Sequence, residues 1–490
     1  MTHLSFQSSS GPIRNMYEFL TVKDRFTGQF GDDGLASSWS VLPDGKTWTF
    51  KLRENVPFYQ NKVPTAWTFS AKDVLASLEM EFLDKANSGR AGNLSPFFEP
   101  PDNLTLVGDN TVIFSLKTPN VDWPEFVSDE QWGVISKDYL DLVGEDGYTK
   151  SPIGTGPFTF KEKVLDSYFL FERVEGHWRN TPEFLELQFL FVREDATRFA
   201  MLLTEEAEIV DIPGTLLPGA EERGFKRVTS TLPSLYLFAV LGGVYFDNLP
   251  EYDPNEPLAN LKVRQALNHA IDRELIQEIF FPRNSFPQAI HGMPPFREPY
   301  DPSWVAYEFD PDRARQLLID AGYPNGLELD LLVTSQLSGV PEIPEIGEAL
   351  VPMWEAVGFK MKIKEVQLGA LVSDWDDRKH ARTVNLVRYS IGPMSVVWPG
   401  VIKEDRLPIF HDDVLRDLYF NEYVKVTTVE EKNRLELEYG QRMYDQYGSL
   451  PVLWISGQVA INPNVVAEYT SSMLNFGAAR QHEFTKAVFK

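Results

Sequence analysis

The sequence predicts an α/β protein built from two lobes. Strand-rich segments stand at both ends of the chain, and a succession of helices and strands lies between them after about residue 240. Helix–strand–helix–strand succession is typical of an α/β lobe. A chain of 490 residues is too long for one ordinary core and predicts two to three domains. We therefore expect the C-terminus to complete the first lobe, with a cleft between the lobes.

The first strand-rich segment contains a hairpin at residues 42–58, LPDGKTWTFKLRENVPF. Asp44-Gly45 favours a tight turn, because glycine adopts a positive φ without steric cost. After the turn, Trp48, Phe50 and Leu52 alternate with polar residues, which is the period of a strand with one buried face. We expect these three side chains to lie in a core.

A helix and further strands are expected next. Ser70 has the position of a helix N-cap, with Asp73 three residues later, and apolar residues then recur at helical spacing. Asp109-Asn110 marks the turn of a second hairpin. The pattern further predicts strands at 112–116 and across 151–192, a helix over about 195–203 and a short strand at 208–212.

The α/β part begins with a long apolar face in VRQALNHAIDRELIQEIF. One helical face carries Val263, Ala266, Leu267, Ala270, Ile271, Leu275 and Ile279. We expect one amphipathic helix with this face buried.

The rest of this part alternates regularly. Asp310-Pro311 predicts a helix start with a good cap and proline in the first turn, and Gly322 predicts its end. The pattern then predicts a strand at 327–331, a helix at about 344–357, a strand at 359–363 and a final strand-like segment at 450–461.

Composition excludes several function classes. There are 46 Lys and Arg against 71 Asp and Glu, a net charge of −25, which argues against nucleic acid or an anionic membrane as a partner. The absence of cysteine excludes disulfides and thiolate chemistry. No apolar run approaches the ~18 residues of a membrane span. The start, MTHLSFQSSSGP, lacks the basic and apolar regions of a signal peptide.

We find no catalytic or metal-binding pattern. The seven histidines form no HExxH and no pair at ligand spacing, so we expect no metal. The GTGPF loop lacks the lysine of a phosphate-binding loop, and no GxSxG occurs. Asp376-Asp377 and Asp412-Asp413 are adjacent acids of the kind that usually lie on a solvated surface. We therefore expect neither an enzyme nor a cofactor.

Several stretches, spread in order over most of the chain, carry a resemblance to a known family. They are LASSWSVLPDGKTWTFKLRENVPF, FSAKDVLASLE, SPIGTGPFTFKEK, FERVEGHWR, MLLTEEAEIVDIP, VRQALNHAIDRELI and FDPDRARQLLIDAGYPNG. Together they resemble the family 5 extracellular solute-binding proteins, the oligopeptide/dipeptide/nickel-type receptors of ABC importers.

The resemblance implies a type II periplasmic-binding-protein clamshell, with two lobes and an extra small α+β domain on lobe I. It places lobe I at 1–16, 151–240 and 456–490, the extra domain at 17–150 and lobe II at 241–455. It also implies a monomer that binds a peptide or other small solute between the lobes and delivers it to a membrane permease driven by an ATPase. The location implied is the periplasm or the outer face of the cytoplasmic membrane, so we expect the start of this chain to be truncated or misplaced.

The resemblance also indicates candidate ligand contacts. Peptide-binding members carry an aspartate that meets the peptide amino group, whereas this chain has Arg388 and Tyr389 there, in VRYSIGPMSVVWPG. A guanidinium suits a carboxylate or phosphate, which predicts an anionic or sugar-like ligand, unless Arg388 forms a structural ion pair. Trp398, Tyr236 and Trp132 are further ring candidates, with core packing as the alternative for each.

Two other functions remain open from the sequence. A clamshell-derived enzyme could act on acidic or glycan substrates, and turnover lost on one carboxylate substitution would reveal it. A ligand sensor is a second alternative, although no basic helix–turn–helix segment is present to contact DNA.

Overall fold

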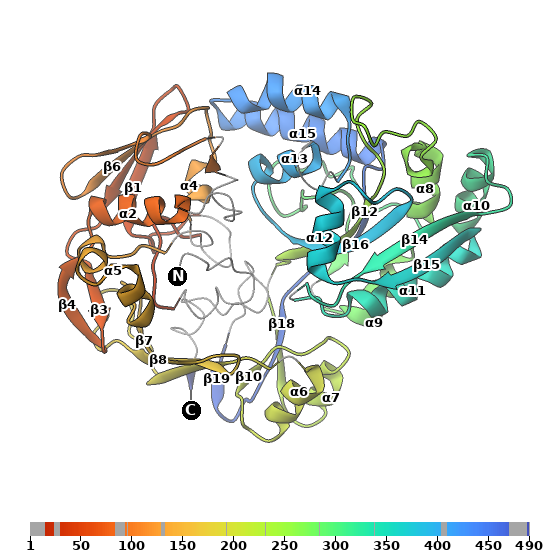
Figure 1. Ribbon diagram of the computed structural model, residues 1–490. Helices are drawn as coiled ribbons and strands as arrows, with labels where there is room; N and C mark the ends of the chain where they lie inside the picture. The colour runs from red at the N-terminus through yellow and green to blue at the C-terminus, as the bar shows by residue number, and fades with distance from the viewer. Residues whose placement is uncertain are drawn as a thin grey trace.

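The computed structural model shows two bodies that lie side by side (Figure 1). The first part of the chain lies on the left of Figure 1 and the α/β part on the right, with a smaller unit below. The structure describes residues 15–23, 30–83, 94–95, 97–128, 133–192, 194–230, 232–283, 285–337, 339–402, 409–469 and 488–489.

The predicted hairpin is confirmed. The strands β1 (Ala36–Val41) and β2 (Thr47–Leu52) pair in a four-stranded antiparallel sheet of order β1-β2-β6-β5, with β5 at Leu104–Leu106 and β6 at Thr111–Ser115. In the turn, the Asp44 carboxylate accepts from the backbone N–H groups of Lys46 and Thr47 at 2.8 and 2.9 Å. The side chain of Trp48 is buried, and its Nε1 donates to the Asn120 carbonyl at 3.1 Å. The hairpin is therefore part of the core.

Two helices pack beside this sheet. The helix α2 (Ala71–Phe82) begins with the predicted cap, where Ser70 and Asp73 form a capping box. Asp73 also accepts from the backbone N–H of Lys137 at 2.8 Å, at the start of α5 (Lys137–Lys150). The remaining elements of this region are β3 (Pro57–Gln60), β4 (Val63–Thr68) and α4 (Trp123–Phe126).

The GTGPF loop lies against the N-terminal segment. The backbone N–H of Gly156 donates to the Met16 carbonyl at 2.8 Å. A Cβ at Gly154 would lie 2.1 Å from the same oxygen, so only glycine fits there. The strands that follow form a three-stranded antiparallel sheet, β7 (Phe158–Val164), β8 (Tyr168–Arg173) and β9 (Glu186–Leu190).

The smaller unit has its own apolar cluster. A three-stranded sheet orders β10 (Ile209–Val210), β18 (Gln458–Ile461) and β11 (Lys226–Thr229), with α6 (Asp195–Leu203) and α7 (Leu217–Glu221) packed nearby. A two-stranded pair, β19 (Val466–Glu468) with β20 (Val488–Phe489), lies close to it in Figure 1.

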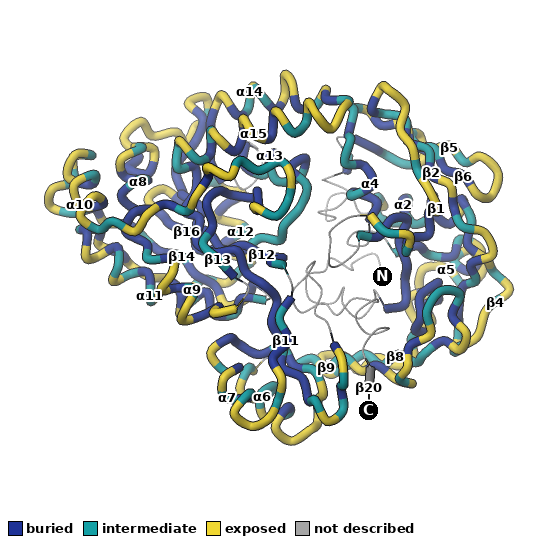
Figure 2. Tube along the Cα trace, turned by 180° about the vertical axis from the view of Figure 1, so that it is seen from behind, coloured by how far each residue is buried: buried dark blue, intermediate teal, exposed yellow. Residues whose placement is uncertain are grey.

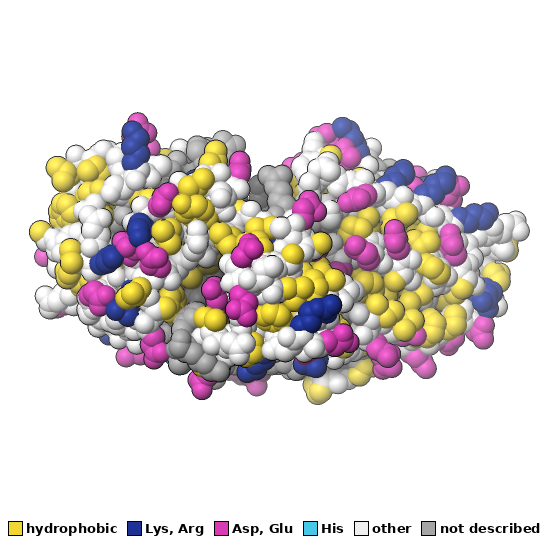
Figure 3. All heavy atoms as spheres, turned by 90° about the horizontal axis from the view of Figure 1, so that it is seen from below, with side chains coloured by type: hydrophobic (Ala, Val, Ile, Leu, Met, Phe, Trp, Pro, Cys, Tyr) yellow, Lys and Arg dark blue, Asp and Glu magenta, His cyan; other side chains and the backbone are white. Residues whose placement is uncertain are grey.

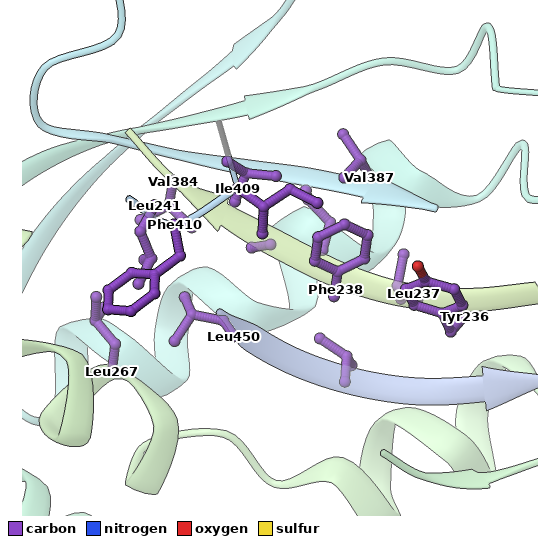
Figure 4. Packing of buried hydrophobic residues seen from close by; sticks show 14 of the residues in the cluster. Tyr236, Leu237, Phe238, Leu241, Leu267, Val384, Val387, Ile409, Phe410 and Leu450 are labelled. Carbon is purple, nitrogen blue, oxygen red and sulfur yellow. The ribbon is translucent and has the colours of Figure 1, made fainter. Parts of the chain in front are cut away.

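A mixed six-stranded sheet forms the centre of the α/β part. Only β14 pairs in parallel within it, with β15 and β16. Figure 4 shows apolar side chains of the central strands packed together. The strand order is β13 (Phe286–Pro287), β17 (Leu450–Ile455), β12 (Leu235–Leu241), β16 (Thr383–Ser390), β14 (Leu327–Val333) and β15 (Phe359–Glu365).

Helices surround this sheet in the α/β part. They are η1 (Pro257–Ala259), α8 (Leu261–His269), α9 (Arg273–Phe280), α10 (Pro311–Asp320), α11 (Ile343–Ala356), α12 (Leu368–Asp376), α13 (Met394–Ile402), α14 (Asp413–Asn421), η2 (Tyr423–Lys425) and α15 (Val429–Asp445). The predicted helices at 310–322 and 344–357 are confirmed as α10 and α11.

The predicted single helix over VRQALNHAIDRELIQEIF is wrong. The chain breaks after α8, and Asp272 caps a new helix by accepting from the Leu275 N–H at 3.0 Å. The break changes the phase of the apolar face. Ile276 is fully buried, whereas Leu275 and Ile279 are 41% and 48% exposed.

The strand pairing bears on the domain division. Strand β12 lies in the six-stranded sheet and shares its core, so we propose that lobe II begins before Leu235 rather than after residue 240. A second core spans the predicted lobe I and extra domain together. The rest of the domain division remains a proposal, and its segments 1–14 and 470–487 lie outside the described residues.

Candidate functional site

Two segments cross side by side between the small sheet and the six-stranded sheet (Figure 2). One leads from β11 into β12, and the other leads from β17 into β18. The Ser230 N–H donates to the Gly457 carbonyl at 2.8 Å, the Gly457 N–H donates to Ser230 Oγ at 2.9 Å, and the Ser234 N–H donates to the Ile455 carbonyl at 3.1 Å. The predicted strand-like segment 450–461 is therefore two strands divided by this crossing. We take this double connection as the candidate hinge between the two sheets.

Aromatic rings gather at the end of the six-stranded sheet that meets the hinge. Tyr236 pairs with Tyr389 on one side and Trp454 on the other, at ring distances of 6.2 and 5.1 Å. Phe238 lies two residues along the same strand, 5.1 Å from the ring of Tyr389 (Figure 4). We call these four residues and His291 the ring cluster.

The ring cluster carries no charge of its own at neutral pH. The Nε2 of His291 lies 3.4 Å from the Tyr236 hydroxyl oxygen, and its ring lies 4.5 Å from that of Phe238. Burial lowers the pKa of His291 to about 3, so the imidazole is neutral. Tyr389 and Ser390 at the end of β16 are only partly buried. Tyr389 is therefore the member of the ring cluster that reaches the surface, since Tyr236, Phe238, Trp454 and His291 are each at most 1% exposed.

Two of the candidate ligand contacts, Tyr236 and Tyr389, lie together in the ring cluster. The candidate Arg388 does not belong to it. Arg388 pairs with Leu237, whereas Tyr389 pairs with Tyr236. Successive strand residues point to opposite faces, so the Arg388 side chain leaves the sheet away from the ring cluster. It is 6% exposed, and burial lowers the pKa of its guanidinium to about 10, which leaves it charged.

The other two ring candidates do not join the cluster. Trp398 lies in α13, fully buried among Tyr419, Tyr423 and Tyr439 at ring distances of 4.8–5.6 Å. Its Nε1 donates to the Leu415 carbonyl at 3.2 Å. This environment matches the alternative of core packing. Trp132 lies outside the described residues.

A contact far from the hinge joins the predicted extra domain to lobe II. The Nζ of Lys432 in α15 lies 2.9 Å from the Asp122 carboxylate, and Ser395 Oγ lies 3.5 Å from its other oxygen. Nearby, Glu125 lies 2.6 Å from Lys23 Nζ and 3.8 Å from Arg297. We call the bonds of Asp122 to Lys432 and Ser395, together with those of Glu125 to Lys23 and Arg297, the interlobe contact. No local sequence pattern indicates this contact, because Asp122 and Lys432 stand 310 positions apart.

A groove lies beside the interlobe contact. It holds about 300 Å³ of space, including the part open to solvent. Asn120 borders it and is 95% buried, since 5% of the residue is exposed. The lining comes from both sides: Phe97, Pro119, Asn120, Val121 and Asp122 from the extra domain, and Ser395, Tyr419, Tyr423, Val424, Val426 and Lys432 from lobe II.

Metal binding and membrane crossing can be checked on the part of the chain that the structure describes. Within that part, no three His, Asp or Glu side chains gather as a metal site. None of the helices within the described ranges combines the length and apolar character that crossing a bilayer requires. On the face in Figure 3, acidic side chains are intermixed with lysines and arginines. What the arrangement supports is binding between two lobes that rotate about a hinge.

The comparisons identify the class of protein. The family model for bacterial extracellular solute-binding proteins, family 5, matches residues 33–399, and the chain belongs to this family. The predicted type II clamshell is confirmed by solved structures. One is the dipeptide binding protein from Pseudoalteromonas sp. SM9913 in complex with Met-Leu, with a TM-score of 0.80 and 21% identity over 100% of this chain and 97% of that one. Another is DppA from Helicobacter pylori in complex with the peptide STSA, with a TM-score of 0.78 and 20% identity over 98% and 94%.

Curated relatives extend the comparison. Heme-binding protein A of Haemophilus influenzae is 26% identical over 91% of this chain and 83% of its own length. The dipeptide-binding protein of Escherichia coli is 27% identical over 71% of this chain, and the match spans 65% of that relative.

Proposed function

We propose that the protein is an extracytoplasmic receptor that captures a small solute between its lobes and delivers it to an ABC permease driven by an ATPase. The observation that carries this proposal is the paired crossing at Ser230 and Gly457, which gives a family 5 chain the hinge that closure requires. We place it, as a monomer, in the periplasm or at the outer face of the cytoplasmic membrane. It needs no cofactor for this role.

We further propose a short peptide as the ligand. Two kinds of support apply. Tyr389, the partly exposed member of the neutral ring cluster, can pack against an apolar side chain of the ligand while its hydroxyl meets a polar backbone group. Relatives include proteins named as dipeptide-binding and glutathione-binding. Because Arg388 points away from the cluster, the anionic or sugar-like ligand becomes the second candidate.

Binding without turnover is the expected behaviour. The relatives are solute-binding proteins, and the ring cluster has no carboxylate pair that could act as acid and base. Incubation with the stabilising peptide should return it unchanged. A cleaved product, lost on substitution of one carboxylate, would instead favour the clamshell enzyme.

A thermal-shift screen tests the ligand class. One pool holds dipeptides to pentapeptides, and the other holds carboxylates, phosphorylated compounds and oligosaccharides. A ligand at 100 times its Kd should add about 2.7 kcal/mol to the free energy of unfolding. We expect stabilisation by the peptide pool. Stabilisation by the second pool alone would support the Arg388 hypothesis of an anionic or sugar-like ligand. If neither pool stabilises the protein, the result contradicts both the peptide hypothesis and the Arg388 hypothesis.

Tyr389→Ala then tests the site. We expect at least about a tenfold loss of affinity, because a packed aromatic contact is removed from the partly exposed end of β16. The matched control is Tyr252→Ala, which removes a tyrosine that is 41% exposed outside the sheet. Isothermal titration with the peptide found in the screen measures both. Equal affinity for the two variants would show that the ring cluster is not the site.

A further inference from the structure

The interlobe contact joins the two bodies at the side of the molecule away from the hinge. Asp122 immediately precedes α4, and Lys432 lies in the first turns of α15. Figure 1 shows α4 on the left body facing α13, below α14 and α15. Rotation about the hinge separates these elements, so every bond between them exists only in the closed form.

The contact is too well enclosed to be an ordinary surface pair. The side chains of Asp122 and Lys432 are each 14% exposed. Exposed pairs such as Lys117–Glu99, at 38% exposure each, contribute little, because water solvates both charges whether or not they meet. In the closed form, removing one partner by mutation leaves the other charge largely buried and unpaired, which is strongly disfavoured.

Packing around the pair depends on closure too. Val396 at the start of α13 packs against the core of the first body. The hairpin turn at Gly45 lies against Thr427, since a Cβ built on Gly45 would be 3.2 Å from the Thr427 Cα. The ion pair therefore sits inside a fitted surface from which water is partly removed.

We infer that the Asp122–Lys432 pair is a latch that shifts the open–closed equilibrium of the ligand-free protein toward the closed form. The latch shares no residue with the ring cluster. It acts on affinity through the closed fraction, because apparent affinity is the intrinsic affinity multiplied by the fraction of molecules able to hold the ligand. The effect on affinity rests on the proposed solute-binding function. The shift of the open–closed equilibrium does not.

Spin labels can measure closure directly. The chain has no cysteine, so Thr105→Cys on β5 and Val414→Cys on α14, both exposed, attach one nitroxide to each body. Double electron–electron resonance on the full-length, ligand-free protein then gives the distance distribution. Asp122→Asn and Lys432→Met should each lower the ratio of short to long distances at least about tenfold. Asp122→Lys combined with Lys432→Asp should restore the short distances.

The design separates the latch from a folding defect. The Asp122 carboxylate makes no capping bond to α4, and its backbone N–H bond to Asn120 is kept in Asp122→Asn. The control Lys117→Met removes a lysine that pairs within the extra domain, and it should leave the distances unchanged. Identical distances in wild type and both single variants would overturn the latch, as would a charge reversal that stays open.

Affinity gives an independent readout. Asp122→Asn should weaken binding of the ligand found in the screen in proportion to the lost closed fraction. A change in the distances without any ligand found would leave the latch standing and count against the proposed function. Weaker binding with unchanged distances would place Asp122 in the ligand site and overturn the latch.

Discussion

Single residues decide whether the first body can assemble. Gly154 presses its backbone on the Met16 carbonyl, and Gly156 bonds to the same oxygen. Neither position needs a left-handed backbone, so the requirement for glycine there is one of space. The GTGPF loop, which the sequence pattern places before a strand, therefore also packs against the N-terminal segment.

Gly154→Ala tests this requirement. We expect a loss of about 1–3 kcal/mol in the free energy of unfolding, because the new methyl would lie 2.1 Å from the Met16 oxygen and the backbone must shift. Urea denaturation measures the loss. Gly369→Ala is the control, since its Cβ would meet nothing within 4 Å in helix α12. That change should be neutral or stabilising. Equal effects of the two substitutions would refute the steric account.

Elements in this fold are joined by buried polar side chains at their ends. Asp73 accepts from the Ser70 N–H at 2.7 Å and from the Lys137 N–H at 2.8 Å, and only 1% of it is exposed. One carboxylate thus caps α2 and fixes the start of α5. Burial raises the pKa of Asp73, and these two hydrogen bonds oppose that rise.

Asp73→Ala should therefore destabilise two helices at once. We expect a loss of about 2–3 kcal/mol in the free energy of unfolding, because two buried N–H donors lose their acceptor. The control Asp138→Ala removes a carboxylate that is 44% exposed and paired with Lys72, and should cost under about 1 kcal/mol. Equal losses in urea denaturation would mean that the cap does not join the helices.

Sequence periodicity predicted where most helices and strands lie. It did not predict which face of a helix is buried after a break in the chain. The 3.6-residue pattern through Leu275 and Ile279 continued over Asp272, whose side chain starts a new helix and turns those residues to solvent. The ring candidates Tyr236 and Tyr389 met because strand pairing placed them opposite each other. Neither pairing register nor the partners of Asp122 and Lys432 can be derived from local patterns, because both depend on segments far apart in the chain.

At the scale of the whole molecule, buried acids link stability to pH. Glu436 in α15 is 3% exposed, and burial raises its pKa to about 7, with Lys432 opposing the rise and Asp122 adding to it. The folded protein therefore binds a proton between about pH 4.5 and pH 7 that the unfolded chain has released. The contribution of Glu436 to the free energy of unfolding therefore falls as the pH rises through this window.

Glu436→Gln should flatten that dependence. We expect the wild-type protein to lose on the order of 3 kcal/mol from this group between pH 4.5 and 7, and the amide variant to keep it, because glutamine does not ionise. Chemical denaturation at several pH values measures the slope. Glu438→Gln, an exposed neighbour on the same helix, is the control. Equal slopes in the wild type and in Glu436→Gln would exclude Glu436 as the source.

The latch between Asp122 and Lys432 has a cost for transport fidelity. A permease that recognises its receptor by the closed shape would accept an empty molecule that the latch has already shut, and would spend ATP without cargo. A stronger ion pair would thus raise the amount of solute captured at low solute concentration. It would also increase the number of ATP-hydrolysing transport cycles that carry no solute. The strength of one ion pair would set a compromise between sensitivity and false delivery.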